Sequence, residues 1–255
     1  MKFDDLDAKM RVFETAHDHC VLPGIYIVMR LDGRSFTRLT KEVNAFKAPF
    51  DKRFRDLMIH TTMTVMESGF RTVYGYTQSD EISILLHRDE DSFGRKERKF
   101  NSLLAGAASA GFSMGLGEVG VFDSRVCQLP SVELVRDYFR WRHEDANRNA
   151  LNAHCYWIQR REGASVKDAT NRLKGMSVAE KNEFLFQRGL NFNDLPAWHK
   201  RGIGVHWTTV GKPAINRKTG KPVTAERRTL RVDLKLPKGD AYGAYVLKLL
   251  AASEE

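Results

Sequence analysis

Short apolar runs alternate with longer amphipathic segments through the first half of the chain. Residues 24–33, GIYIVMRLDG, form a compact apolar run that ends in Asp-Gly and is typical of a buried strand. Residues 51–68 predict a helix, which Asp51 can cap and Gly69 can follow. Its less polar face is formed by Leu57, Met58, Thr61, Thr62, Val65 and Met66.

Three further strands and a second helix complete this half of the chain. Residues 71–76 and 81–87 predict strands too close together for anything but a hairpin. Residues 92–114 predict a helix and residues 118–129 a fourth strand. The order β-α-β-β-α-β is the ferredoxin-like arrangement, an antiparallel sheet with both helices on one face. We therefore expect an α+β fold, which by itself implies no function.

The pattern changes after Pro130. Residues 132–161 predict a long helix, on which Trp141, Tyr156 and Trp157 lie near helical spacing and are expected in the core. Two short helices follow, with Ser165 and Ser177 as capping residues. Residues 202–210 and 227–236 predict strands joined by a long basic loop. We therefore divide the chain into a region 1–130 and a helical and β-hairpin region 131–255.

Charge points to an anionic partner. The net charge is +9 and the pI about 9.5, which favours nucleic acid first and an acidic membrane surface second. Residues 200–235 hold ten Lys or Arg and two acidic residues. This stretch fits a solvated loop or one that follows phosphates equally well.

Composition also bounds the location. Three cysteines without a CxxC pair fit a reducing cytosol, and the histidines lack zinc-binding spacing. The amino terminus is polar and acidic, unlike a signal peptide, and no run of about 18 apolar residues predicts a membrane span. We expect a cytoplasmic protein with no membrane segment.

Three carboxylates are predicted to converge. In the expected sheet the first and third strands are central, so Asp32 at the end of the first lies near Asp80 and Glu81 at the hairpin. Unpaired, such acids repel one another and their pKa values rise. Mg²⁺ relieves this and favours one or two carboxylates with substrate phosphates. Two such ions lower the pKa of an attacking hydroxyl and neutralise a leaving pyrophosphate. Either acidic motif alone fits a plain turn.

Neighbouring residues suggest a phosphate site. The backbone amides of Gly33, Arg34 and Ser35 can form an anion-binding nest. Lys47 either contacts a triphosphate or is a solvated loop lysine. Residues 123–125, Asp-Ser-Arg, are expected to brace the fourth strand through an internal ion pair.

Several separate motifs, in order, resemble one family over residues 3–207. The motifs are RLDGRSF, YGYTQSDEIS, FDSRV, YFRWRHEDANRNAL and AEKNEFLF with LPAWHKRG. They resemble the tRNA-His guanylyltransferase family, the 3′-to-5′ nucleotide polymerases. The resemblance implies a polymerase palm, two Mg²⁺ ions, a homotetramer, and tRNA and nucleoside triphosphates as substrates. It also implies that ATP or GTP activates a monophosphate 5′ end, which the 3′-hydroxyl of an incoming nucleotide then attacks.

The resemblance also implies roles for individual residues. Asp32, Asp80 and Glu81 would be catalytic, with metal held by Asp32, the Gly33 carbonyl and Asp80. The nucleotide would be bound by Gly33, Arg34, Ser35, Phe36, Lys47 and Ser79, although Phe36 equally fits a core position. RNA would be contacted by Arg142, Asn149, Lys181, Asn182, Lys200 and Arg201.

One departure from the family pattern bears on specificity. Members that add guanosine to tRNA-His carry His-Ile-Asn-Asn, where this chain has Asn147, Arg148, Asn149 and Ala150. The missing histidine favours the bacterial and archaeal "like-protein" branch, which extends truncated tRNA 5′ ends by Watson–Crick templating. Guanosine addition at position −1 of tRNA-His is the alternative. A nucleotidyl cyclase on the same palm scaffold and a non-catalytic tRNA-binding module are further alternatives.

Overall fold

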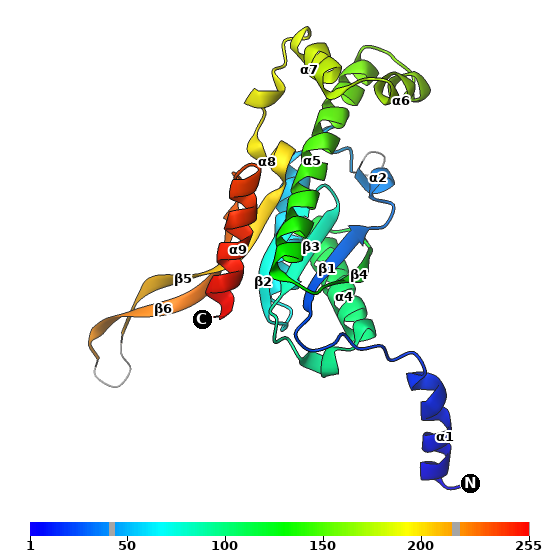
Figure 1. Cartoon of the computed structure of the whole chain (residues 1–255), viewed down its shortest axis with the longest axis vertical. Helices are drawn as coiled ribbons and strands as arrows, with labels where there is room; N and C mark the ends of the chain where they lie inside the picture. Colours follow the sequence, from blue (N-terminus) through cyan, green and yellow to red (C-terminus); the bar gives the residue numbers. More distant parts are fainter. Residues whose placement is uncertain (41–43, 216–219, 255) are drawn as a thin grey trace.

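A six-stranded antiparallel sheet forms the centre of the molecule (Figure 1). The computed structural model describes residues 1–40, 44–215 and 220–254. The sheet order is β4-β1-β3-β2-β5-β6. The strands are β1 (Tyr26–Gly33), β2 (Thr72–Gln78), β3 (Glu81–Leu86), β4 (Phe122–Leu129), β5 (Ile203–Ile215) and β6 (Pro222–Asp233). The predicted α+β class is confirmed, and β1 and β3 are neighbours as expected.

Two helices cover one face of the sheet, α3 (Lys52–Met66) and α4 (Glu97–Leu116). The Asp51 side chain caps α3 by accepting a hydrogen bond from the Arg53 amide. Helix α4 begins five residues later than predicted, because Phe93 and Gly94 take left-handed φ values of 57° and 63° within the short helix η2 (Ser92–Arg95). Alternate β1 side chains, such as Met29 and Leu31, pack beneath these helices and form the larger core.

The opposite face is covered by α5 (Val132–Arg161) and α9 (Asp240–Glu254) (Figure 1). The predicted bounds of α5 are confirmed. Helix α9 was not predicted, although it buries Tyr242, Val246 and Leu250. The prediction that Trp141 lies in the core is wrong, since its side chain is 54% exposed on the flank of α5.

Smaller elements complete the chain. They are α1 (Phe3–Thr15), α2 (Phe36–Arg38), α6 (Val166–Lys174), α7 (Val178–Phe186), η3 (Phe192–Asp194) and α8 (Ala197–Arg201). Ser165 and Ser177 cap α6 and α7 as predicted. Helix α1 buries none of its residues and points away from the sheet (Figure 1).

The prediction of a long basic loop between the last two strands is wrong. Strands β5 and β6 continue as a paired ribbon out to Ile215 and Pro222, which projects from the body (Figure 1). Alternation of apolar and polar residues along the ribbon is weak, which hid these strand ends from sequence reasoning. Arg217 and Lys218 of the basic stretch lie outside the described residues.

The sheet continues across the predicted division at residue 130, because β5 pairs with β2. The division into two regions therefore does not correspond to a break in the sheet, and it stays a prediction about function. Among the described residues, no helix is both long and apolar enough to cross a membrane.

Candidate active site

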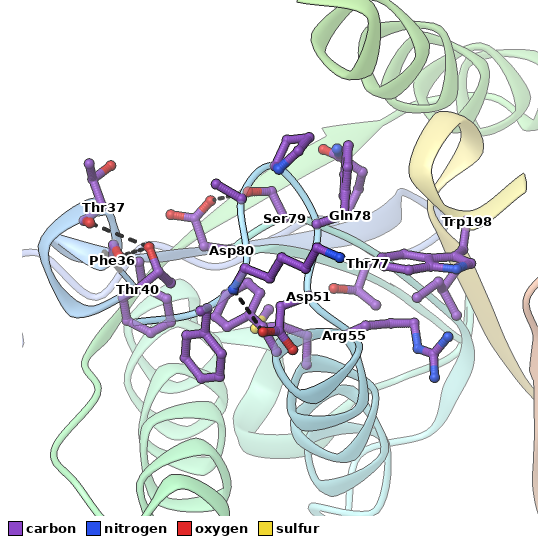
Figure 2. Close-up of a pocket in the computed structure, with 18 of the residues that line it drawn as sticks. Phe36, Thr37, Thr40, Asp51, Arg55, Thr77, Gln78, Ser79, Asp80 and Trp198 are labelled. Atoms are coloured by element: carbon purple, nitrogen blue, oxygen red, sulfur yellow. Dashed lines mark hydrogen bonds between the residues drawn. The ribbon is translucent and has the colours of Figure 1, made fainter. Parts of the chain in front are cut away.

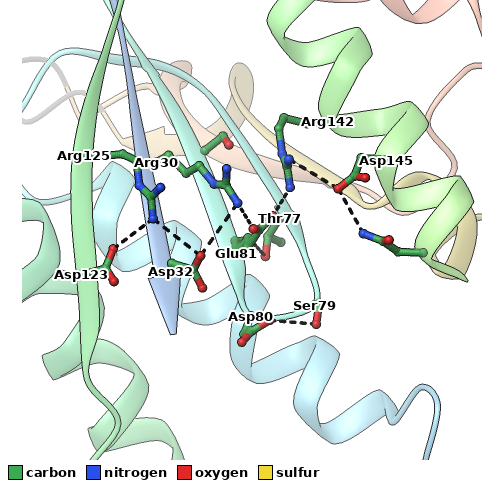
Figure 3. Close-up of polar contacts among 12 residues, drawn as sticks. Arg30, Asp32, Thr77, Ser79, Asp80, Glu81, Asp123, Arg125, Arg142 and Asp145 are labelled. Carbon is green, nitrogen blue, oxygen red and sulfur yellow. Dashed lines mark hydrogen bonds and ion pairs between the residues drawn. The ribbon is translucent and has the colours of Figure 1, made fainter. Parts of the chain in front are cut away.

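The ends of β1 and β3 bring the predicted acids together (Figure 3). Asp32 and Glu81 are direct partners in the β1–β3 register. The Gly33 amide donates a hydrogen bond of 3.0 Å to the Asp80 carbonyl, which ties the end of β1 to the β2–β3 turn. The convergence of Asp32, Asp80 and Glu81 at one edge of the sheet therefore follows from strand pairing alone.

Glu81 is held by two arginines. Its carboxylate accepts hydrogen bonds from Arg30 of β1 and Arg142 of α5 (Figure 3). Arg142 is only 6% exposed and also lies 3.5 Å from Asp145. This arrangement gives Glu81 a structural task, the attachment of α5 to the sheet.

Asp32 and Asp80 have weaker partners. Asp32 lies 3.8 Å from Arg30 and 3.9 Å from Arg125, beyond good hydrogen-bond distance. Burial raises the pKa of Asp80, and the charges of Asp32 and Glu81 raise it further, although a 3.0 Å hydrogen bond from Ser79 opposes them. Among the residues that the structure describes, these two carboxylates therefore have no strong counter-charge.

Arg125 also lies 3.6 Å from Asp123, so the ion pair expected in the Asp-Ser-Arg segment is present. The pair extends to Asp32 across the β1–β4 register, where Asp123 and Asp32 are direct partners. Arg125 therefore links the fourth strand to the candidate site.

The prediction that three backbone amides form an anion-binding nest is partly wrong. The Gly33 amide is bound to Asp80, and the Arg34 amide donates to the Val121 carbonyl at 2.8 Å. The third residue of the predicted nest, Ser35, has a left-handed backbone conformation with φ of 60°. Two of the three predicted amides are thus used to hold the loop rather than to bind an anion.

Phe36 belongs to the core. Its ring lies 4.6 Å from that of Phe112 and 5.0 Å from that of Phe122. A Cβ atom at position 33 would approach the Phe36 ring to 2.6 Å, so the close contact requires glycine. Phe36 also lines a pocket beside the β2–β3 turn.

A pocket of about 220 Å³ opens between the β2–β3 turn, the loop before α3, and α8 (Figure 2). Its polar side carries two predicted nucleotide-binding residues, Lys47 and Ser79, together with Asp80. Its other side is aromatic, with Phe46, Phe50, Phe54, Trp157 and Trp198. The combination of a cation, a carboxylate and aromatic rings suits a ligand with a charged end and a flat apolar end.

Sequence reasoning missed most of this pocket. Arg55 from α3 stacks on Trp198 from α8 at 5.0 Å, although 143 positions separate them in the chain. Trp157 comes from α5. The cluster of Phe46, Lys47 and Phe50 around a proline was an available signal, because aromatic and basic residues in one loop are typical of ligand contacts.

The predicted RNA contacts fall into two groups. Arg142 and Lys200 are buried, and Lys200 is only 4% exposed, with its ammonium donating to the carbonyls of Phe192 and Asn193. The expectation that these two side chains contact RNA is therefore corrected. Arg201 donates to the Leu236 carbonyl at 2.7 Å.

The remaining candidates lie nearer the surface. Asn149 donates to Asp145 from the exposed side of α5, and Lys181 is half-buried on α7. Asn182 donates to the Val178 carbonyl and borders a second cavity of about 430 Å³, which Asn147, Arg201 and Lys238 also line. Direct RNA contact by these residues stays a prediction.

Comparison with known proteins identifies the family. Residues 7–130 match the family model described as tRNAHis guanylyltransferase, and residues 133–236 match the model described as Thg1 C terminal domain. A "Probable tRNA(His) guanylyltransferase" of Mus musculus is 34% identical over 212 residues, which cover 79% of this chain and 70% of the mouse protein.

Solved structures are similar as well. A bacterial tRNA(HIS) guanylyltransferase (Thg1)-like protein in complex with GTP superimposes with a TM-score of 0.72 and 26% identity, covering 97% of this chain and 99% of the other. The crystal structure of tRNA(His) guanylyltransferase from Saccharomyces cerevisiae gives a TM-score of 0.71 and 26% identity, covering 80% and 93%. With the site geometry and the matched models together, this chain belongs to the tRNAHis guanylyltransferase family, a family of nucleotidyltransferases.

Proposed function

We propose that this nucleotidyltransferase adds nucleotides, in the 3′-to-5′ direction and by base-pair templating, to the 5′ end of truncated tRNA. The observation that carries the proposal is the convergence of Asp32 and Asp80 beside the pocket that holds Lys47 and Ser79. In this scheme β1 to β4 with α3 and α4 form a ferredoxin-like palm. The GTP complex of the similar bacterial protein supports a nucleotide as ligand.

Asp32 and Asp80 fit a divalent cation. Burial raises the pKa of Asp80, and the nearby charges of Asp32 and Glu81 raise it further; a cation would remove that repulsion. Among the described residues, no cluster of three or more His, Cys, Asp or Glu side chains forms a ready metal site. With only two carboxylates, the remaining ligands would be phosphates and water, which suits Mg²⁺. The two proposed ions would supply charge neutralisation at the phosphates.

The chain's own residues would bind and orient the nucleotide. Lys47 and Ser79 would contact phosphates, while Trp198 and Phe50 offer aromatic surfaces for the base. Arg30 and Arg142 would keep Glu81, and hence the β2–β3 turn, in place. ATP or GTP would occupy this pocket when it activates a 5′-monophosphate end.

Templating is supported by residues 147–150. Ala150 is buried against Leu185 and Phe192, and the side chains of Arg148 and Asn149 are both bonded to Asp145. Arg148 and Asn149 thus already have a partner on α5, and residues 147–150 include no histidine. If the base on the opposite strand selects the incoming nucleotide, the protein needs no residue that recognises the end of tRNA-His.

Guanosine addition at position −1 of tRNA-His is the second candidate. It is favoured by the names of the relatives, since the mouse protein is described as a probable tRNA(His) guanylyltransferase. Both candidates share the pocket and the carboxylates, so they differ only in what selects the base. Either proposal includes a homotetramer, which the family resemblance suggests. Either also includes a cytoplasmic location, which the free cysteines suggest.

The deciding experiment supplies each labelled nucleoside triphosphate in turn to 5′-truncated and full-length tRNAs whose template base is varied. Templated addition predicts that the incorporated nucleotide follows the opposite base in every tRNA. Guanosine incorporated regardless of that base would establish the second candidate instead. Cyclic nucleotide formed without RNA would point to a cyclase and overturn both.

A further inference from the structure

Helix α1 carries an apolar stripe that the rest of the described chain leaves uncovered. None of its residues is buried, and the helix points away from the sheet (Figure 1). Four large apolar side chains form the stripe and are between 42% and 78% exposed: Phe3, Leu6, Met10 and Phe13. An exposed apolar surface of this kind is typical of an interaction site.

The spacing of the stripe is that of a coiled-coil seam. Its residues are three, four and three positions apart, so they alternate as the a and d positions of a heptad that begins at Phe3. Ala8 is then at the f position, on the side opposite the seam, and Val12 is at the c position, outside it. A seam this narrow fits one other helix better than it fits the face of a sheet.

The charges beside the seam match those of a second α1 in parallel orientation. Lys2 and Lys9 are at g positions, and Asp7 and Glu14 are at e positions. In a parallel pair each g residue meets the e residue five positions later on the other helix, so Lys2 meets Asp7 and Lys9 meets Glu14. An antiparallel pair would place lysine against lysine and acid against acid, and these contacts are repulsive.

The other charges of α1 agree with a protein partner. Arg11 donates two hydrogen bonds of 3.0 Å to Asp7. Such a pair between exposed side chains contributes little, and the carboxylate can accept a further bond from a lysine. The helix carries four acidic residues, Asp4, Asp5, Asp7 and Glu14, against two basic ones, Lys9 and Arg11. This negative balance disfavours RNA and an acidic membrane surface as partners.

We propose that α1 pairs in parallel with α1 of a second copy of this chain, as a short two-stranded coiled coil. Each apolar residue of the stripe packs against its equivalent in the second copy, and the lysines beside the seam bind the acids of the other helix. A helix of 13 residues is marginally stable alone, so the pairing also stabilises α1. The inference goes beyond the proposed function by naming a contact between copies, and it requires neither RNA nor nucleotide.

Sedimentation equilibrium of the full chain, without RNA or nucleotide, tests the seam. Phe13→Asp places a charge on the stripe and should raise the dissociation constant for self-association by at least about 10-fold, as loss of an aromatic contact at an interface does. Val12→Asp is the matched control, because Val12 is adjacent and similarly exposed, at 66% against 72%, but lies outside the seam. It should leave the dissociation constant unchanged.

Charge reversal tests the orientation. Lys2→Glu with Lys9→Glu places acids against Asp7 and Glu14 in a parallel pair, so self-association should weaken by at least about 3-fold at low salt. Adding Asp7→Lys and Glu14→Lys to the same chain restores opposite charges and should restore the association. An antiparallel pair predicts no such rescue, because like charges face each other in all three proteins.

Engineered disulfides test which residues meet. In a Cys20→Ser background, which removes the exposed native thiol, Leu6→Cys should form a cross-linked dimer on mild oxidation. Ala8→Cys, on the opposite side of α1, should not. Cross-linking only between Leu6→Cys and Met10→Cys chains would show an antiparallel pair and overturn the proposal.

Three further results would overturn the proposal. They are wild-type association in Phe13→Asp, an equal loss in Val12→Asp, and a wild-type chain that stays monomeric at every concentration. Binding of that monomer to phosphatidylcholine vesicles, lost in Phe13→Asp, would assign the stripe to a membrane surface instead. Because the assays contain no tRNA, failure of templated synthesis would not affect their outcome.

Discussion

Asp32 and Glu81 lie directly opposite each other on β1 and β3, and Arg30 contacts both carboxylates. The contact with Glu81 is a hydrogen bond that Arg142 reinforces, whereas the contact with Asp32 is long, at 3.8 Å. One register pair thus contains an acid fixed by arginines and an acid free to take a different partner. The two residues should respond differently to substitution.

Asp32→Asn should remove nucleotidyl transfer and leave the fold intact. The variant keeps the size of the side chain and removes only the charge that the proposed cation requires. We expect transfer to fall by at least roughly 100-fold, the scale seen when a preorganised charge contact is lost, with little change in the unfolding midpoint. Single-turnover incorporation into a truncated tRNA measures the effect.

Asp123→Asn is the matched control, because Asp123 lies beside Asp32 in the sheet and shares Arg125. Its carboxylate is more exposed and is predicted to have no catalytic task, so transfer should stay within a few-fold of wild type. Equal losses in the two variants would mean that the charge balance around Arg125 matters, and not a specific role of Asp32.

Glu81→Gln should instead act on stability. It leaves the guanidinium of Arg142 buried with one carboxylate, Asp145, at 3.5 Å. Removing one partner of a buried ion pair costs about 3 kcal/mol, and the free energy of unfolding in urea should fall by about that amount. In an Arg142→Met background the same substitution should cost clearly less, because the stranded charge is gone. A full cost in both backgrounds would contradict the pairing.

The sequence was sufficient for the part of the fold that strand periodicity and capping determine. The ends of α5 and the pairing of β1 with β3 follow from apolar spacing and from the order of elements. That pairing alone brought Asp32 to Asp80. The acids were therefore predictable as neighbours, although 48 positions separate them.

What could not be predicted depends on contacts between distant side chains. Asp32 and Glu81 differ because Arg142, which is 61 positions after Glu81 in the chain and lies on α5, binds Glu81. Helical spacing suggested a buried Trp141, but on a helix packed against a sheet by one face, the flank position stays exposed. Lys200 resembled a phosphate contact in sequence, and only the fold shows that it binds two carbonyls.

Buried histidines should make the protein acid-sensitive. Burial lowers the pKa of His154 to about 4, and the charge of Arg161 contributes further. The Nε2 atom of His154 has no hydrogen-bond partner within the described part of the chain. In the unfolded chain the pKa is near the usual 6.5. As the pH falls from 6.5 towards 4, the unfolded state binds a proton that the native state does not, so stability is lost in that window.

His154→Leu should flatten this dependence. Each such histidine contributes up to about 1.4 kcal/mol per pH unit to the slope of the free energy of unfolding against pH, between pH 6.5 and 4. The variant should lose the contribution of one histidine. Urea unfolding at half-unit pH steps measures the slope. His143, whose pKa burial also lowers to about 4, keeps its own contribution in the variant. An unchanged slope would show that His154 is protonated equally in both states.

The projecting β5–β6 ribbon offers a test of phosphate contact in which its two faces serve as experiment and control. Lys212 and Arg227 lie on one face, since their register partners are Ala225 and Val210, whereas Arg228 lies on the other, stacked 4.4 Å from the Trp207 ring. If the ribbon follows the tRNA backbone with the Lys212 face, Lys212→Ala with Arg227→Ala should weaken tRNA binding for every sequence alike. The slope of log affinity against log salt should become shallower by about 1 to 2. Arg228→Ala should leave that slope unchanged, because its guanidinium is already engaged with Trp207. A slope that the double variant does not alter would establish the basic stretch as a solvated surface.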